Sequence, residues 1–152
     1  MFNVLIVGGG AAGLSCALVL GSAKKQHFAQ DKNIGIITHQ KTSDLQNALF
    51  NNVLGLPPGT TGASLLKDGK EQLKKLYPHV EQLENEKVFE IIKADTLFRV
   101  KTNKNTYQAE LVVIAVGYSN LITIKGLEDY IEPHPRAEQE KHRIWLKNTD
   151  HL

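Results

Sequence analysis

Short apolar runs alternate with longer polar segments along the chain, and this pattern predicts most of its elements. Continuous apolar runs without charge are typical of strands that are buried on both faces of a parallel sheet. Runs of this kind predict strands at residues 4–7, 33–39 and 111–115, and a further short strand is predicted at residues 77–83. Alternating apolar and polar positions between turn residues predict two or three antiparallel strands, at residues 88–92, 96–102 and 106–109.

Two segments have the composition or spacing of helices. Residues 11–20 are good helix formers, and in residues 63–76 leucines recur at helical spacing behind a cap at Thr61 or Gly62. Strands that alternate with helices predict an α/β fold with a parallel sheet. The antiparallel strands are then expected to form an inserted β-meander that lies on one face of this sheet.

The segment at residues 47–62 is rich in Gly, Pro and Asn, so we expect an ordered loop without regular structure. Its large apolar residues indicate that the loop packs onto something; they are Leu49, Phe50, Val53, Leu54 and Leu56. The tail at residues 128–152 is highly charged and holds two prolines. Only residues 144–146 suggest a short amphipathic piece within it.

The clearest candidate site is a G-x-G-x-x-G formed by Gly8, Gly10 and Gly13, which follows the first strand and opens the first helix. Here the first glycine permits a tight turn, the second lets the backbone approach a pyrophosphate, and the third lets the helix pack against the strand. The N–H groups of the first helical turn, around Ala11 and Ala12, would face the phosphates. The sequence therefore predicts a Rossmann-like domain that binds FAD or NAD(P).

The second predicted strand ends without the acidic residue that usually accepts hydrogen bonds from the ribose in this motif. Thr38 and His39 stand there instead, and the next carboxylate along the chain is Asp44. A threonine hydroxyl can also hydrogen-bond a ribose, so Thr38 and His39 are candidate ligands. The alternative is that Thr38 only ends a strand.

Composition and charge exclude several other classes of protein. The 152 residues carry a net charge of +2 with interspersed signs, which argues against nucleic-acid and membrane-surface partners. No basic segment precedes the uncharged first 23 residues, and the three consecutive glycines followed by a fourth at Gly13 would serve a membrane-spanning helix badly. Cys16 is the only cysteine, so we expect a cytoplasmic protein without a disulfide or a metal site. We interpret Cys16 itself as a core residue.

The order of these motifs resembles the FAD domain of thioredoxin-reductase-like flavoproteins, the class II pyridine-nucleotide-disulfide oxidoreductases. The glycine motif is followed by Asn52-Val-Leu-Gly-Leu-Pro57, by the meander, and by a strand ending in Ala-Val-Gly where the family usually has Ala-Thr-Gly. The resemblance implies an FAD-binding domain at residues 1–127, with the meander at 86–110, and a separate tail at 128–152. Beyond the glycine loop, it implies cofactor contacts at Asn52, Val88, Ala115, Val116 and Gly117.

The sequence also departs from this family. One cysteine cannot form the family's redox Cys-x-x-Cys pair, residues 118–152 are too few for a nicotinamide domain, and no Gly-Asp pair follows Gly117. We therefore expect the chain to be a truncated or partial form of the family and to hold FAD weakly. We also expect it to associate with itself or with a partner protein, and to meet NAD(P)H only through another chain.

Three functions remain open at this point, and for each the catalytic residues are unknown. The first is an FAD-binding oxidoreductase or a remnant of one, in which the flavin carries out the redox chemistry. The second is an NAD(P)-binding domain, because Thr38 and His39, with Lys41 nearby, suit a 2′-phosphate. The third is a non-catalytic FAD-binding or sensor module. The asparagine loop, the meander and the second signature favour the flavoprotein.

Overall fold

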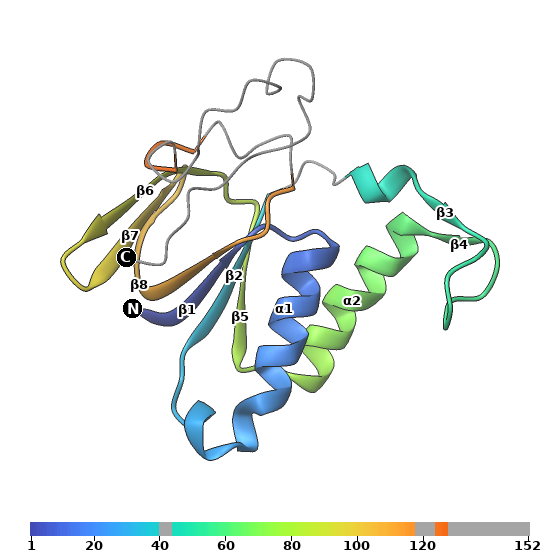
Figure 1. Cartoon of the computed structure of the whole chain (residues 1–152), viewed down its shortest axis with the longest axis horizontal. Coiled ribbons are helices and arrows are strands. Elements are labelled where there is room, and N and C mark those ends of the chain that lie inside the picture. Colours follow the sequence, from blue (N-terminus) through green and yellow to red (C-terminus); the bar gives the residue numbers. More distant parts are fainter. Residues whose placement is uncertain (40–43, 118–123, 128–152) are drawn as a thin grey trace, which may run out of the picture.

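The computed structural model describes residues 1–39, 44–117 and 124–127, which form a mixed sheet with helices on one face (Figure 1). The predicted tail at residues 128–152, its piece at 144–146, and Lys41 lie outside the described residues. In chain order the elements are β1 (Phe2–Val7), α1 (Ala11–Ser22), β2 (Ile34–Thr38), β3 (Leu49–Phe50), β4 (Thr60–Thr61), α2 (Gly62–Leu76), β5 (Val80–Glu84), β6 (Val88–Ala94), β7 (Leu97–Thr102) and β8 (Thr106–Ile114). Short 3₁₀ turns lie at Ala23–Lys25, His27–Ala29 and Asp44–Asn47.

The order of strands in the sheet is β5-β2-β1-β8-β7-β6, which confirms the predicted α/β fold. The first four of these strands are parallel, and Val4 of β1 lies opposite both Ile34 of β2 and Leu111 of β8. The predicted strands at 4–7 and 33–39 correspond to β1 and β2. The strand predicted at 77–83 begins only at Val80, because a turn first reverses the chain after α2 and the Val80 N–H donates to the Tyr77 carbonyl (3.0 Å).

β8 corrects the prediction of separate strands at residues 106–109 and 111–115. It is one continuous strand whose first half pairs antiparallel with β7 and whose second half pairs parallel with β1. Ala109 marks the change of partner, since it lies opposite Phe98 of β7 and also opposite Phe2 of β1. The charged Glu110 is exposed and made the sequence look interrupted at this point. β8 therefore joins the meander to the parallel sheet without a break.

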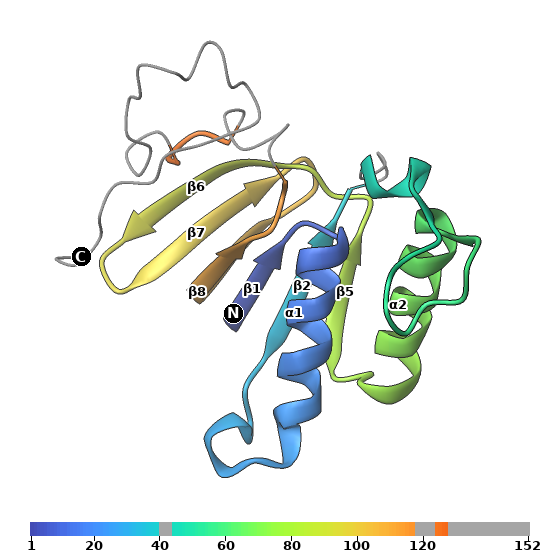
Figure 2. The same cartoon turned by 45° about the vertical axis from the view of Figure 1, so that its right-hand side comes forward.

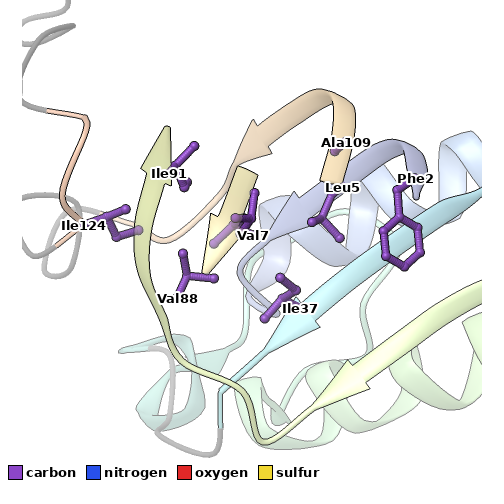
Figure 3. Close-up of a cluster of buried hydrophobic side chains, with 9 residues drawn as sticks. Phe2, Leu5, Val7, Ile37, Val88, Ile91, Ala109 and Ile124 are labelled. Carbon is purple, nitrogen blue, oxygen red and sulfur yellow. The ribbon is translucent and has the colours of Figure 1, made fainter. Parts of the chain in front are cut away.

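Two hydrophobic cores lie on opposite faces of the parallel strands, as their alternating side chains require. On one face, Ile6 and Ile36 pack with residues of α1 and α2. On the other, Leu5, Val7 and Ile37 pack with residues of the meander such as Val88 (Figure 3). The meander strands β7 and β6 continue the same sheet beyond β8 (Figure 2), which corrects the prediction of a meander lying on one face of the sheet. Their inward side chains join the core on the face opposite the helices.

The two helices begin for different local reasons. α2 begins behind Thr61, whose hydroxyl accepts a hydrogen bond from the Ser64 N–H (3.1 Å), so the expected cap is confirmed. Its buried side is formed by Leu66 and Leu73, while the rest of the helix carries charged side chains. α1 carries no comparable set of charged side chains. It also lacks a side-chain cap, because its first turn is built on the glycine motif.

The segment at residues 47–62 is more regular than predicted, because β3 and β4 pair antiparallel to form a short hairpin. The hairpin is closed by the Gly59 N–H, which donates to the Phe50 carbonyl (2.9 Å) and to the Asn51 side-chain oxygen (3.0 Å). Its apolar side chains do not pack as expected, since Leu49 is 62% exposed and Leu54 is fully exposed. Within the described residues this apolar surface is uncovered.

His79 makes the stability of the fold sensitive to pH. It lies just before β5, and its buried Nε2 atom has no hydrogen-bond partner among the described residues. Burial lowers the pKa of His79 from its ordinary 6.5 and the charge on Lys24 lowers it further, whereas a backbone hydrogen bond with Gly21 partly opposes this. The unfolded chain therefore binds more protons than the folded chain as the pH falls below that value.

We expect the melting temperature to fall between about pH 7.5 and 5.5, and to fall less in a His79→Gln variant. Thermal unfolding followed by circular dichroism at the two pH values measures both losses. His27→Gln, which removes an exposed histidine, is the matched control and should behave as the wild type. Equal losses in the wild type and in His79→Gln would contradict this account.

Candidate functional site

The predicted G-x-G-x-x-G forms the turn between β1 and α1, at the carboxyl ends of the parallel strands (Figure 1). Gly8 has a φ of +120°, and a Cβ on it would overlap the carbonyl oxygen of Ala115. A Cβ on Gly13 would overlap the carbonyl oxygen of Gly8, so only glycine lets the helix start this close to the turn. A Cβ on Gly9 would lie 2.6 Å from Cγ2 of Thr38. The loop therefore presents only backbone atoms, and it packs closely against the ends of β1, β2 and β8.

The N-terminal end of α1 is open to an anion. Gly10 is the N-cap residue, so it offers no capping side chain, and the first turn holds no acidic residue. The Leu14 N–H donates to the Gly10 carbonyl (3.0 Å), and the N–H groups before it have no partner within the helix. Ala11 and Ala12 are exposed. Free N–H groups and the positive end of the helix dipole are what phosphate binding at a helix requires.

Thr38 and His39 lie at the end of β2 beside this loop, but they differ in exposure. Thr38 is 3% exposed, and its methyl group faces Gly9. Its carbonyl oxygen accepts a hydrogen bond from the Glu86 N–H (3.1 Å), which ties β2 to the segment after β5. His39 is exposed. The structure thus places Thr38 next to the glycine loop and turns His39 toward solvent.

The second signature, Ala115-Val116-Gly117, lies against the first. The Ala115 N–H donates to the Val7 carbonyl (2.8 Å), and the Ala115 carbonyl oxygen is the atom that leaves no room for a side chain on Gly8. Gly117 has a φ of +69° and nothing within 4 Å of where a Cβ would be. Two motifs about a hundred residues apart in the sequence therefore meet at one edge of the sheet.

Asn52 and Val88 are not brought into this group. Asn52 is exposed in the β3–β4 hairpin, which lies beside the N-terminal end of α2 rather than beside the glycine loop (Figures 1 and 2). The side chain of Val88 is 6% exposed and packs with Val7 and Ile37 in the hydrophobic core on the face of the sheet opposite the helices (Figure 3). Both residues remain predicted ligands.

A buried carboxylate next to the site was not predicted from the sequence. Glu86 is 5% exposed and accepts hydrogen bonds from Thr102 Oγ1 (2.6 Å), Tyr107 Oη (2.8 Å) and Asn105 Nδ2 (3.3 Å). Burial alone raises the pKa of Glu86, but these three hydrogen bonds and the charge on Lys104 outweigh burial and lower it. Burial and the bond to Glu86 raise the pKa of Tyr107, so its hydroxyl stays a donor at neutral pH.

Cys16 is half-buried on α1 and packs against the helix-side core, in agreement with its interpretation as a core residue. Burial raises the pKa of its thiol, which keeps the thiol protonated at neutral pH.

Among the described residues, no three His, Cys, Asp or Glu side chains are grouped so that they could hold a metal ion. Neither helix in residues 1–39 and 44–117 is long and apolar enough to cross a membrane.

Known proteins resemble this chain in sequence and in fold. Residues 2–150 match the family described as pyridine nucleotide-disulphide oxidoreductase. Among solved structures, a thioredoxin reductase from T. acidophilum is 28% identical with a TM-score of 0.62, and an oxidoreductase from Agrobacterium tumefaciens is 26% identical with a TM-score of 0.64. A thioredoxin reductase from Lactococcus lactis, 21% identical with a TM-score of 0.65, shares the fold.

The chain spans only part of these proteins. The matches cover 85%, 85% and 86% of this chain but 40%, 41% and 40% of the T. acidophilum, A. tumefaciens and L. lactis structures. A search among curated proteins found no match. The family match nevertheless extends over nearly the whole sequence and includes both signatures that meet at the site. The chain belongs to the pyridine nucleotide-disulphide oxidoreductase family.

Proposed function

We propose that the chain binds FAD through a domain at residues 1–127 and works as the flavin-binding part of a thioredoxin-reductase-type oxidoreductase. The observation that supports this most strongly is the glycine loop, where Gly8 and Gly13 leave no room for a side chain and α1 begins without a cap. A backbone cradle at the positive end of a helix suits a pyrophosphate. The family match favours a dinucleotide over a simple phosphate ligand.

The described residues suggest where each part of the cofactor would lie in the site. The pyrophosphate would lie over the backbone of residues 10–13, and the ribose of its adenosine half would lie toward Thr38 and His39 at the end of β2. Gly117, which is exposed and open above its Cα, would leave room on the other side of the loop. When bound, the flavin supplies the redox chemistry, and the residues of this chain bind and orient it.

We further propose that the electron donor and acceptor act through a second chain. The 152 residues hold one cysteine, so they cannot supply a dithiol. The apolar hairpin with Leu49 and Leu54, which no described residue covers, is a surface through which a second copy or a partner protein could complete the enzyme. NAD(P)H would then reach the flavin from that partner.

The chief alternative is a domain that binds NAD(P) itself. It is favoured by Thr38 and His39, which stand at the end of β2 in place of a ribose-binding acid. A visible absorption spectrum of the purified protein, followed by mass identification of the released nucleotide, separates the two. Flavin bands and FAD support the proposal, whereas release of NAD(P) alone would replace it by the alternative. A non-catalytic sensor module would also bind FAD but would not be reduced by any donor chain.

Replacing Gly10 with valine tests where the pyrophosphate lies. The backbone of Gly10 has a φ of −80° and a ψ of −170°, which valine adopts readily, so the variant should fold. Its branched side chain would occupy the approach to the α1 N-terminus, and we expect FAD affinity to fall at least about tenfold, or about 1.4 kcal/mol.

Flavin fluorescence quenching on titration with FAD measures this change. Ser22→Val, which adds the same side chain at the exposed C-terminal end of α1, is the control and should bind FAD as the wild type does. Wild-type affinity in Gly10→Val would show that the pyrophosphate lies elsewhere.

A further inference from the structure

The Glu86 network connects the meander to the residues that we assign to the adenosine half of FAD. The three donors to the Glu86 carboxylate come from the end of β7, from the turn after it and from the start of β8; they are Thr102, Asn105 and Tyr107. The next residue is tied to the same turn twice, because the Lys87 N–H donates to the Asn103 side-chain oxygen (2.7 Å) and the Lys87 carbonyl accepts from the Asn103 N–H (3.1 Å). Residues 86 and 87 are therefore fixed to the β7–β8 turn.

The other side of the same segment faces the predicted nucleotide site. The Glu86 N–H donates to the Thr38 carbonyl (3.1 Å), and the Thr38 side chain packs against Gly9 of the glycine loop. Val88, a predicted cofactor contact, follows two residues later and is anchored in the core. A continuous series of direct contacts thus runs from the β7–β8 turn through Glu86 to Thr38 and the glycine loop.

The carboxylate of Glu86 is occupied by the protein itself. Three donors share its two oxygens, the side chain is buried, and no cation among the described residues lies within ion-pair distance of it. The direct partners of this buried charge are all neutral donors, and Lys104 adds only a longer-range attraction. Burial of the charge costs desolvation, so losing any donor or the charge should disturb the whole network. Such a carboxylate acts by positioning its neighbours and not by touching a ligand.

We propose that Glu86 is a positioning residue for the adenosine half of the cofactor, because it holds the wall formed by Thr38 and residues 86–88 in the shape that the nucleotide requires. This inference rests on the proposed function, since it assumes that the glycine loop binds an ADP-containing dinucleotide. It assigns the meander a role beyond extending the sheet, namely that of fixing the far side of the nucleotide site.

The test is isothermal titration of the full chain with ADP and with FAD. We expect Glu86→Gln to weaken ADP binding by about tenfold, because the NH2 group of the glutamine would face groups that themselves donate hydrogen bonds. Tyr107→Phe should weaken ADP binding several-fold, because it removes one donor while the charge on Glu86 stays. Two controls accompany them. Glu84→Gln removes an exposed carboxylate close by, and Ile91→Ala creates a cavity in the same hydrophobic core as Val88, at a position on β6 that is not paired with any residue of the network.

Both controls should bind ADP within about twofold of the wild type at a temperature where all variants are folded. If Glu86→Gln and Tyr107→Phe bind ADP like the wild type, the inference is overturned. It is also overturned if Ile91→Ala weakens ADP binding as strongly as Glu86→Gln does. A wild type that binds neither ADP nor FAD would overturn the proposed function, and this inference with it. Binding by the wild type with no effect in Glu86→Gln would overturn the inference alone.

Discussion

Replacing Gly13 with alanine should abolish measurable FAD binding and lower the free energy of unfolding by about 1–3 kcal/mol. The added Cβ would overlap the carbonyl oxygen of Gly8, which is backbone and cannot rotate away. α1 would have to move off the end of β1 or the loop would have to open. In either case the N–H groups of the first helical turn would no longer point into one cradle.

Gly69→Ala provides a matched control for this substitution. It makes the same change inside the other helix, where the new Cβ would lie 3.4 Å from Leu14 Cδ1, an ordinary contact distance. Alanine favours a helix over glycine by about 1 kcal/mol, so this variant should be as stable as the wild type or more stable. Urea unfolding and FAD titration of both variants give the comparison. Equal behaviour of the two alanines would contradict the tight packing described at Gly13.

The glycine loop could be predicted from the sequence because its signal is local. A charge-free strand, the spaced glycines and the run of helix formers are contiguous, and each glycine corresponds to a steric requirement that a single residue meets. The structure adds the other half of the site, since the close approach of Ala115 to Gly8 depends on the pairing of β8 with β1. That pairing joins residues about a hundred positions apart, and only their likeness to a family motif indicated it.

Other features could not be predicted because they depend on partners distant in sequence. The continuity of β8 through the exposed Glu110 depends on pairing with β7 on one half and β1 on the other. A lone glutamate in a sequence is ordinarily a solvated side chain, so nothing marked Glu86 as buried until the turn after β7 supplied its donors. The apolar residues of the hairpin predicted that it packs onto something, but Leu49 and Leu54 are exposed within the part of the chain that the structure describes.

The stability of the fold and the chemistry of the site should be separable by mutation. Leu73 lies on α2, is fully buried, and belongs to the helix-side core together with Ile36 and Leu66. Truncation to alanine removes buried methyl groups and leaves a cavity that the surrounding side chains fill only in part. We expect Leu73→Ala to lower the free energy of unfolding by about 2–5 kcal/mol, a large fraction of what a domain of this size possesses.

Leu76→Ala is the control, because it makes the same truncation one turn later on α2, where the side chain is 53% exposed. It should cost less than about 1 kcal/mol. Below the melting temperature of either variant, FAD affinity should match the wild type, since neither side chain belongs to the glycine loop or to the Glu86 network. Urea unfolding measures the first quantity and FAD titration the second. A Leu73→Ala protein that remains folded but loses FAD affinity would show that α2 shapes the nucleotide site directly, through its packing against α1.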